Sequence, residues 1–514
     1  MQKGVDRLRV ASNYSPIHST ITMPFRLGLA SLTALLSFLV PVAAHAQNVE
    51  LRSLDETVTL EGTLINYDGA YYRLDTIYGP ITVDAEGVTC TGPGCPDASM
   101  FFPQTRIASE VALAETLLPA LFAGFAADRG MHLAQPEAAS NGIAYDVTRA
   151  DGTVAARFTV VPGNSDSSFL ALLNGDTDIA LTLRQPTEAE HRADRMYAPD
   201  DPPLSRRVRV LGLDALVPVV AQQNQTDAIS LPDLAAIMTG EIVNWQSLGG
   251  PDAPIALHLL SAELGLAQAF ANKAFNVDAI DLGPHVTTHY SPTALSAAVA
   301  HDAYALGVTA LSAHSTARTI PLVDACGFSQ AANADAVKAE DYPLTTPIYA
   351  YLAPQRLPPL VRDFLNWTET DAAEGIVAAA GFVDQSVMRT PLTVQGARLA
   401  NAVTAAGGEV PLTELQSLVA TLRQAERLSS TFRFTNGSVE FDPHSRASVT
   451  RLANAIETGE FDGRRLIVVG FSDSAGDASA NRRLSLRRAE AARDAILAAV
   501  ESARLDQADI QVHA

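Results

Sequence analysis

The sequence predicts a secreted protein of the α/β class with three folded parts, and three observations carry this prediction. Short runs of β-forming residues alternate with helical patterns from residue 106 to about residue 385, which is typical of α/β folds with parallel strands. Residues 47–100 contain strand-like runs separated by turns, and residues 431–514 return to strands and helices. Because the 514-residue chain is 47% hydrophobic, each part can bury an ordinary core.

The first 46 residues predict a secretory signal. Arg26 precedes an apolar run from Leu27 to Val42, and Ala44-His45-Ala46 supplies the small residues of a cleavage site before Gln47. The run is shorter than the roughly 18 residues that a membrane span requires, so a retained anchor is only the alternative. Met23 would start a signal of ordinary layout and is a candidate start of the chain. We therefore expect export to the periplasm.

Charge and side-chain chemistry exclude several classes of function. Without residues 1–46 the chain keeps 32 bases against 56 acids, a net charge of −24, which disfavours binding to nucleic acid or anionic lipid. His258, His285, His289 and His301 lack metal-ligand spacing, and no serine or cysteine stands in a recognisable nucleophile context. We therefore predict no enzyme, no metal and no cofactor.

Residues 47–100 predict a small β domain in which we find no chemistry. Its strand-like runs are separated by Asp-Gly and Gly-Pro turns and comprise residues 58–60, 63–65, 71–74 and 81–83. Cys90 and Cys95 flank the turn sequence Thr-Gly-Pro-Gly, and an oxidising periplasm favours a disulfide between them. A metal site is the alternative and would need further ligands. We interpret the third cysteine, Cys326, as a buried small hydrophobe.

Residues 103–385 resemble the phosphate-type periplasmic solute-binding proteins in four segments that follow the family's order. These segments are Leu216–Val220 with its continuation through Asn244-Trp245 to Gly250, then Ala305–Gly307, then Asp341–Leu344, and last Phe364-Leu365 with Gly381–Val383. The resemblance implies two α/β lobes that are joined by crossover strands and close on a ligand. The lobes would comprise residues 103–184 with 297–385, and residues 208–296.

The same resemblance places candidate ligand groups at the ends of predicted strands. Ser109 ends the first strand before a helix from Val111 to Ala127, Ser165 lies before the next helix, and Arg184 follows the strand that begins at Asp178. Hydroxyls and backbone N–H groups at helix N-termini suit a small oxyanion such as phosphate, and Arg184 is the base best placed to meet one. As alternatives, the two serines are helix caps and Arg184 is a solvated loop base.

The ligand loop departs from the family after Ile255. Where the family carries an Arg and a Ser-Gly-Thr that hold phosphate, this chain reads Leu257 to Gly265, and the carboxylates of Glu110 and Glu263 would repel an anion. Two functions stay open. One is capture of phosphate or another small anion, with an ABC transporter as a candidate partner; the other is a structural or sensory role in which the cleft captures no solute.

The C-terminal residues 431–514 follow a helical connector, residues 386–430, and resemble the OmpA-like peptidoglycan-binding domains. The motif residues are Gly470-Phe471-Ser472-Asp473, Gly476, Asn481, Leu484-Ser485 and Arg488-Ala489. Leu466 to Val469 predicts a strand, residues from Asn481 onward predict a helix, and Phe432 to Phe441 predicts the first strand of the domain. A further strand begins at Ile510, just before the sequence ends at Ala514, so we expect this domain to be incomplete here.

The OmpA resemblance implies wall binding through Asp473 and Arg488, with Asn481 in the same motif, and hence a location at the cell wall or outer membrane. In the family, the aspartate binds the amino group of diaminopimelate in the peptidoglycan stem peptide and the arginine binds its carboxylate, both through charge-assisted hydrogen bonds. Phe471 and Ser472 stand where the family has His and Thr, and the charged pair is kept. The alternative is a surface ion pair between Asp473 and Arg488, which would contribute little.

Overall fold

The computed structural model describes residues 48–513 apart from residues 70, 98–101, 278–279, 281–284, 325–326, 392–395, 397–399, 401–402, 405–409, 436–437, 472–476 and 501–508. The predicted signal with Met23, the third cysteine, Cys326, and Asp473 therefore lie outside the described residues. Within the described ranges, none of the helices has both the length and the apolar character needed to cross a membrane.

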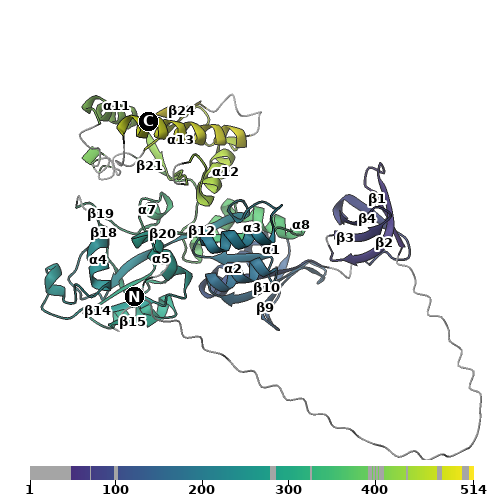
Figure 1. The fold of residues 1–514 in the computed structure, drawn as a ribbon, viewed down its shortest axis with the longest axis horizontal. Helices are drawn as coiled ribbons and strands as arrows, with labels where there is room; N and C mark the ends of the chain where they lie inside the picture. Colours follow the sequence, from purple (N-terminus) through teal and green to yellow (C-terminus); the bar gives the residue numbers. More distant parts are fainter. Residues whose placement is uncertain are drawn as a thin grey trace, which may run out of the picture. The chain divides into compact units, whose positions relative to one another are not determined.

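The N-terminal part is an antiparallel sheet with the strand order β4-β3-β2-β1-β5 (Figure 1). Its strands are β1 (Asn48–Ser53), β2 (Thr59–Tyr67), β3 (Tyr71–Thr76), β4 (Gly79–Asp84) and β5 (Val88–Thr91). Tyr72 and Leu74 alternate with exposed residues along β3 and pack with Val49 and Leu51 in a small core. The runs 58–60 and 63–65 form one strand rather than two, because Gly62 pairs with Val49 and carries the ladder across.

A disulfide closes the end of this sheet. Cys90 lies in β5 and is bonded to Cys95, with an S–S distance of 2.01 Å and a Cα–Cα distance of 5.9 Å. Gly92 lies between them with a φ of 122°, a conformation that favours glycine, and a Cβ there would lie 2.9 Å from the Asn48 carbonyl oxygen. The turn predicted between the two cysteines is thus present and brings the two sulfurs together.

The central part is built on one mixed sheet that extends through two lobes (Figure 1). The first lobe contains β6 (Gln104–Glu110), β7 (His132–Leu133), β8 (Glu137–Ala139), β9 (Gly142–Thr148), β10 (Val154–Gly163) and β11 (Ile179–Thr182). The second contains β14 (Ala256–Leu260), β15 (Val286–His289), β16 (Ala305–Ala310) and β17 (Arg318–Thr319). Two strands, β12 (Val208–Val220) and β20 (Thr345–Leu352), lie between these groups in the sheet order.

Strand β12 belongs to both lobes. Residues 208–215 pair with β20, and residues 216–220 pair with β16 of the second lobe. Nearly the whole of β12 is buried, which explains why its sequence is apolar apart from Arg209 and Asp214 and does not alternate. The predicted two-lobed α/β fold with crossover strands is confirmed.

The predicted boundary between the lobes is wrong for the segment that follows residue 297. We expected residues 297–385 to return to the first lobe, but β16 pairs with β14 and with the second half of β12. Helix α6 (Pro292–Ala300) leads from β15 to β16 and packs on both β14 and β16. A short helical crossover places the next parallel strand in the same sheet, so the chain returns to the first lobe only at β20.

Helices cover the sheet in both lobes. The first lobe has α1 (Leu118–Asp128), α2 (Ser165–Asn174), α3 (Glu188–Tyr197), α8 (Pro359–Trp367) and α9 (Asp371–Ala379); the second has α4 (Leu231–Met238), α5 (Gly265–Phe275), α6 and α7 (Ala334–Lys338). A π-helical turn over Leu113–Leu117 precedes α1. Phe122 of α1 stacks on Phe158 of β10 with ring centroids 4.5 Å apart, and it also contacts Phe364 of α8. This aromatic cluster fixes α1 between the sheet and α8.

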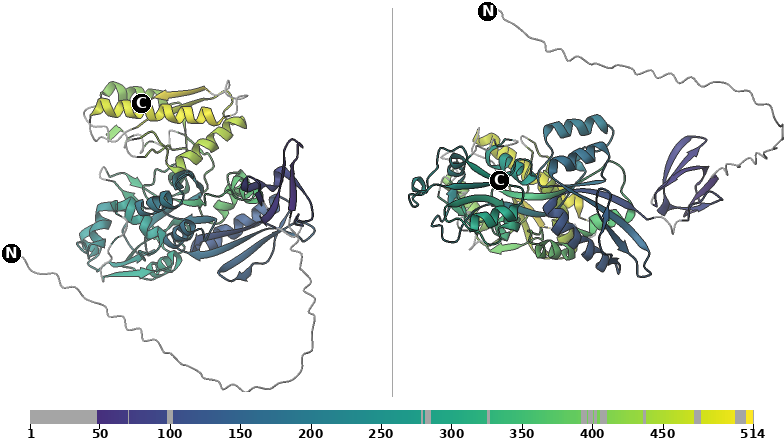
Figure 2. Two further views of the ribbon diagram at one scale, coloured as in Figure 1. Left: turned by 45° about the vertical axis from the view of Figure 1, so that its right-hand side comes forward. Right: turned by 90° about the horizontal axis from the view of Figure 1, so that it is seen from below.

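The C-terminal part contains α11 (Leu412–Leu422), α12 (Pro443–Glu457), β23 (Arg465–Val469), α13 (Ala478–Ala499) and β24 (Asp509–His513). Strands β23 and β24 are parallel, and the long helix α13 lies along them (Figure 2). The sequence predicted a strand from Phe432 to Phe441. The structure has instead one antiparallel bridge, between Phe434 and Phe441. Hydrogen bonds from Thr435 N to Glu440 O and from Ser438 N to Thr435 O turn the chain back there.

Candidate anion sites

The first candidate site lies where three strands of the first lobe end. Strand β6 pairs in parallel with β10 and with β11, and Ser109 stands opposite Pro162 on one side and Leu181 on the other. Carboxyl ends of parallel strands meet at one edge of a sheet, where α/β proteins place their ligands. The residues that follow β10 and β11, Ser165 and Arg184, are therefore brought to the same edge as Ser109.

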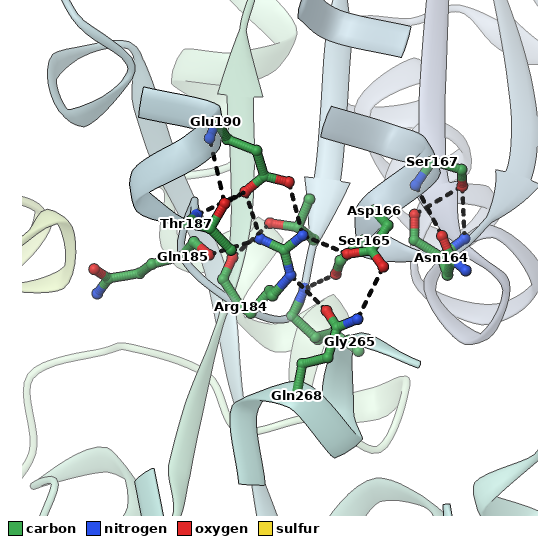
Figure 3. A network of polar contacts seen from close by, with 12 residues as sticks. Asn164, Ser165, Asp166, Ser167, Arg184, Gln185, Thr187, Glu190, Gly265 and Gln268 are labelled. Carbon is green, nitrogen blue, oxygen red and sulfur yellow. Dashed lines mark hydrogen bonds and ion pairs between the residues drawn. The ribbon is translucent and has the colours of Figure 1, made fainter. Parts of the chain in front are cut away.

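Helix α2 begins at this edge with a capping box. Asn164 is the N-cap: its side chain accepts a hydrogen bond from Ser167 N at 2.8 Å, and Ser167 Oγ accepts one from Asn164 N at 3.0 Å (Figure 3). Ser165 is the first residue inside the helix rather than its cap. Its hydroxyl accepts a hydrogen bond from Leu183 N at 3.2 Å and donates one to Glu110 Oε1 at 2.5 Å.

Glu110 occupies the centre of this edge with a buried carboxylate. The residue is 5% exposed, and its Oε1 accepts hydrogen bonds from Ser165 Oγ and from Gly265 N, the latter at 3.2 Å. Burial raises the pKa of the Glu110 carboxyl, while the hydrogen bonds from Ser165 and Gly265 and the charge of Arg184 act in the opposite direction. Glu263, the other carboxylate expected to repel an anion, is exposed.

Gly265 is the second lobe's contribution to the site. It is the first residue of α5, whose N-cap Leu264 offers no side-chain hydrogen bond, so the Gly265 N–H takes Glu110 as its partner. A Cβ at position 265 would lie 2.2 Å from Ser165 Oγ and 2.3 Å from Glu110 Oε1. The two lobes approach this closely because residue 265 has no side chain.

Arg184 has all five of its N–H donors engaged by protein oxygens. Nε donates to Gln268 Oε1 at 2.5 Å, Nη1 to Gln185 O at 2.9 Å and Glu190 Oε2 at 2.7 Å, and Nη2 to Asp166 Oδ1 at 2.5 Å and Glu190 Oε1 at 2.8 Å. Figure 3 shows the guanidinium between Glu190 and Asp166, with Gln268 approaching from α5. The Arg184 side chain is 8% exposed and its guanidinium lies 4.8 Å from the centre of the Phe169 ring.

Gln268 joins the lobes a second time. Besides accepting from Arg184, its Nε2 donates to Asp166 Oδ2 at 3.0 Å, so that α5 of the second lobe is bonded to two residues of the first. Ser109 is buried, and its hydroxyl donates to the Glu110 carbonyl oxygen at 3.1 Å. The structure thus brings Ser109, Ser165 and Arg184 to one edge, and each of their polar groups has a protein partner there.

The carboxylate partners of Arg184 were not predicted from the sequence, although one signal was present. Thr187 and Glu190 form a capping box at the start of α3: Thr187 N donates to Glu190 Oε2 at 2.6 Å, and Thr187 Oγ1 accepts from Glu190 N at 3.3 Å. This Thr-x-x-Glu spacing places a carboxylate six residues after Arg184, at a helix start. Asp166 and Gln268 carry no comparable local signal.

Two of the four histidines that looked scattered in the sequence meet in the second lobe. His258 Nδ1 lies 2.9 Å from His289 Nε2, because parallel strands β14 and β15 bring positions 31 residues apart side by side. Burial lowers the pKa of both imidazoles, which favours a neutral pair sharing one hydrogen bond. Among the described residues, no group of three or more His, Cys, Asp or Glu side chains could hold a metal ion.

The second candidate site lies between β23 and α13 of the C-terminal part. Gly470 follows β23, its N–H donates to His513 O at 2.8 Å, and a Cβ there would lie 2.2 Å from the Ser485 carbonyl oxygen. The strand end therefore contacts α13 one helical turn before Arg488. Asp477 caps α13 by accepting a hydrogen bond from Ala480 N at 2.8 Å.

Arg488 lies in α13, one helical turn after Ser485. Its Nε donates to Ser438 O at 3.3 Å, and the guanidinium lies 5.3 Å from the centre of the Phe434 ring. In the described part of the chain, no carboxylate forms an ion pair with it, and it lines a cavity together with Phe434, Gly470 and Phe471. Asn481 lies in the first turn of α13, and its N–H donates to Asp477 O.

Two family models match the chain. Residues 140–372 match a model described as a PBP superfamily domain, and residues 433–513 match the OmpA family. These matches confirm the predicted joining of a solute-binding type of module to an OmpA domain. No curated protein matches the chain significantly.

Solved structures that resemble the chain include phosphate-binding proteins. An ABC-type phosphate transport receptor from Vibrio cholerae is 18% identical, with a TM-score of 0.42, and the match covers 54% of this chain and 99% of that one. PstS from Borrelia burgdorferi is 15% identical, with a TM-score of 0.38 and coverage of 55% and 98%. At such values the likeness carries no conclusion about a ligand of this chain.

Proposed function

We propose that this chain is a periplasmic protein in which an OmpA domain binds peptidoglycan and holds a solute-binding type of module at the cell wall. The observation that carries this proposal is the free donor capacity of Arg488. Among the described residues its guanidinium makes one hydrogen bond, to a carbonyl oxygen, and no ion pair. Four of its five N–H donors are thus open to a ligand.

The chemistry of this site fits a zwitterionic ligand. A guanidinium binds a carboxylate through two parallel hydrogen bonds, and the Arg488 guanidinium lies 5.3 Å from the centre of the Phe434 ring, whose face favours a cation. Asp473 follows Gly470 by three residues in the sequence, and its carboxylate is the group proposed to bind an ammonium. Diaminopimelate in a stem peptide supplies both groups.

Retention on purified peptidoglycan tests the wall-binding proposal. We expect Arg488→Ala to reduce the fraction retained about tenfold or more, since a hydrogen bond to a charged group contributes about 1.5–3 kcal/mol. Asp473→Ala should have a similar effect. Arg487→Ala is the matched control, because Arg487 is its exposed neighbour on α13 and removes the same charge. Equal retention of wild type, Arg488→Ala and Asp473→Ala would contradict the proposal.

A second candidate function concerns the two-lobed module: a structural or sensory role in which its cleft captures no free solute. The specific observation in its favour is that Glu110 places a carboxylate where the helices α2 and α5 begin. In addition, all five N–H donors of Arg184 are hydrogen-bonded to protein oxygens. A free phosphate would have to displace that carboxylate and would meet its charge. This arrangement disfavours the alternative, delivery of phosphate to an ABC transporter.

Thermal unfolding in the presence of phosphate separates these two functions. A ligand that binds only the folded state at 100 times its Kd stabilises the protein by about 2.7 kcal/mol. We expect no shift of the melting temperature with millimolar phosphate beyond that caused by chloride at the same ionic strength. A saturable shift with phosphate would restore solute capture as the function of the module.

A further inference from the structure

Two helix N-termini, one from each lobe, converge on a single carboxylate oxygen. Helix α2 begins at Ser165 and α5 begins at Gly265, and both the Ser165 hydroxyl and the Gly265 N–H donate to Glu110 Oε1, at 2.5 and 3.2 Å. Unpaired N–H groups and the helix dipole favour negative charge at such a position. The position is thus built for an anion, and the chain's own carboxylate fills it.

The residue that fills this position is enclosed. Glu110 is 5% exposed, and a Cβ added at position 265 would lie 2.3 Å from Glu110 Oε1. No Lys or Arg forms an ion pair with Glu110 in the described ranges, so its hydrogen bonds come from neutral groups. Arg184 nearby is neutralised by Asp166 and Glu190.

We propose that Glu110 acts as a tethered anion that occupies the oxyanion position between the lobes and holds them together without any solute. The proposal rests on the second function proposed for the two-lobed module and names the residue responsible for it. Removing the Glu110 side chain should uncover a site for a free small carboxylate, because the donors on α2 and α5 stay in place.

Covalent attachment explains why a free anion would not compete. A group fixed on the same chain reaches its site at a high effective concentration and loses little further entropy on binding. A free anion entering beside Glu110 would also place two negative charges next to each other in a site of low polarity. Glu110 therefore acts as the specificity determinant, since it excludes free anions as long as it is present.

The same carboxylate links the two lobes. Glu110 ends β6 in the first lobe, and Gly265 starts α5 in the second. The contacts of Gln268 with Arg184 and Asp166 lie beside this link and strengthen it. In this arrangement closure of the cleft is a property of the folded chain rather than a response to a ligand.

Chemical rescue tests the proposal on the full chain. In Glu110→Ala the atoms lost are Cγ and the carboxylate, which together have the size and charge of acetate. We expect acetate to raise the melting temperature of Glu110→Ala saturably by several degrees, relative to chloride at the same ionic strength, and to leave wild type unchanged. Glu263→Ala is the matched control: it removes an exposed carboxylate two residues from Gly265 and should not respond to acetate.

A second variant and a wild-type measurement make every outcome decisive. Glu110→Gln keeps the volume and the acceptor atom, so it should fold and ignore acetate because the position is still filled. If Glu110→Ala folds only in acetate, the proposal is supported. It is overturned if Glu110→Ala folds but ignores acetate, if it stays unfolded in acetate, or if wild type binds phosphate with 1:1 stoichiometry in calorimetry. If wild type does not bind peptidoglycan, the wall-binding proposal is wrong, and the proposal for Glu110 is unaffected.

Discussion

Arg184 and Arg488 are the two arginines for which the sequence predicts an anionic ligand, and their surroundings differ in one decisive respect. Arg184 donates five hydrogen bonds within the protein, four of them to side chains, and its side chain is 8% exposed. Arg488 is half-buried, lies on the Phe434 ring and donates one hydrogen bond to a carbonyl among the described residues.

The difference teaches that position at a strand end does not by itself make an arginine a ligand-binding group. A guanidinium that is buried must have its donors satisfied, and if the protein supplies the acceptors, none is left for a solute. A half-exposed guanidinium on an aromatic ring is held in place without using up its donors. By this criterion Arg488 has the donor capacity of a binding residue, and Arg184 has that of a structural one.

The largest effect expected from this comparison is the loss of stability in Arg184→Ala. The change leaves Glu190, whose side chain is 16% exposed, without its cation, and breaking a buried ion pair costs about 3–5 kcal/mol. Loss of the pair with Asp166 adds little, because that side chain is 56% exposed. Urea unfolding followed by tryptophan fluorescence measures this directly, because both tryptophans of the chain, Trp245 and Trp367, lie in the two-lobed module.

Arg488→Ala is the counterpart in that experiment. Since Trp245 and Trp367 report only on the two-lobed module, the same measurement should give an unchanged urea midpoint for Arg488→Ala. If Arg184→Ala unfolds at the wild-type urea concentration, the Arg184 network does not stabilise the module and the comparison fails.

Gly265→Ala should have the next largest effect. A methyl group at position 265 would stand 2.2 Å from Ser165 Oγ and 2.3 Å from Glu110 Oε1, so the lobes must separate or the serine and glutamate must move. Overpacking of this kind costs about 1–3 kcal/mol. Spin labels placed on the two lobes should report a longer and broader distance distribution. Gly375→Ala in α9 is the control, since nothing lies within 4 Å of its added Cβ. Equal distance distributions in wild type, Gly265→Ala and Gly375→Ala would show that residue 265 does not determine how closely the lobes approach.

Arg488→Lys tests whether the wall site needs the guanidinium or only its charge. A lysine keeps the positive charge but loses the paired donors, so we expect retention on peptidoglycan to fall about fivefold to tenfold, less than in Arg488→Ala. Arg487→Lys should bind as wild type does. Full retention by Arg488→Lys would mean that the site binds through charge alone.

The sequence predicted the features that depend on neighbouring residues. Strand β6, a helix near residue 165 and strand β23 follow from local runs and helix-start signals, and the bond between Cys90 and Cys95 follows from a turn between them. The order of four family-like segments predicted the two lobes. Each of these signals lies within a few residues, where propensity and capping determine the structure.

The features that the sequence could not predict depend on contacts across the fold. Glu110 looked like a charge that repels an anion, and only the approach of Gly265, 155 residues away, shows that it accepts hydrogen bonds instead. The acceptors of Arg184 include Gln268, 84 residues away. The assignment of residues 297–385 to the first lobe failed at β16 for the same reason, since strand order in a sheet is decided by crossovers rather than by the strand's own residues.

The smallest effect is a change in the pH dependence of stability when Glu110 is replaced by Gln. Burial raises the pKa of Glu110 above its usual value of 4.5, so the folded state holds the proton more tightly than the unfolded state. The stabilisation that protonated Glu110 contributes is therefore fully present below about pH 4.5 and is lost as the pH rises through the raised pKa of the folded state.

The measurement that checks this sign is the difference in unfolding free energy between wild type and Glu110→Gln, followed by tryptophan fluorescence from pH 7 downward. Other titrating groups cancel in the difference, including buried Asp214 and Glu374, whose pKa values burial also raises. As the pH falls, the unfolding free energy of wild type should rise relative to that of Glu110→Gln, by about 1.4 kcal/mol for each unit by which the pKa is raised. A difference that stays constant would mean that the hydrogen bonds from Ser165 and Gly265 and the charge of Arg184 offset the cost of burying the charge. A change of the opposite sign would mean that these hydrogen bonds and the Arg184 charge exceed the cost of burying the charge. The surroundings of Arg184 would then favour an anion, and they would differ less from those of Arg488 than the two arginines' hydrogen bonds indicate.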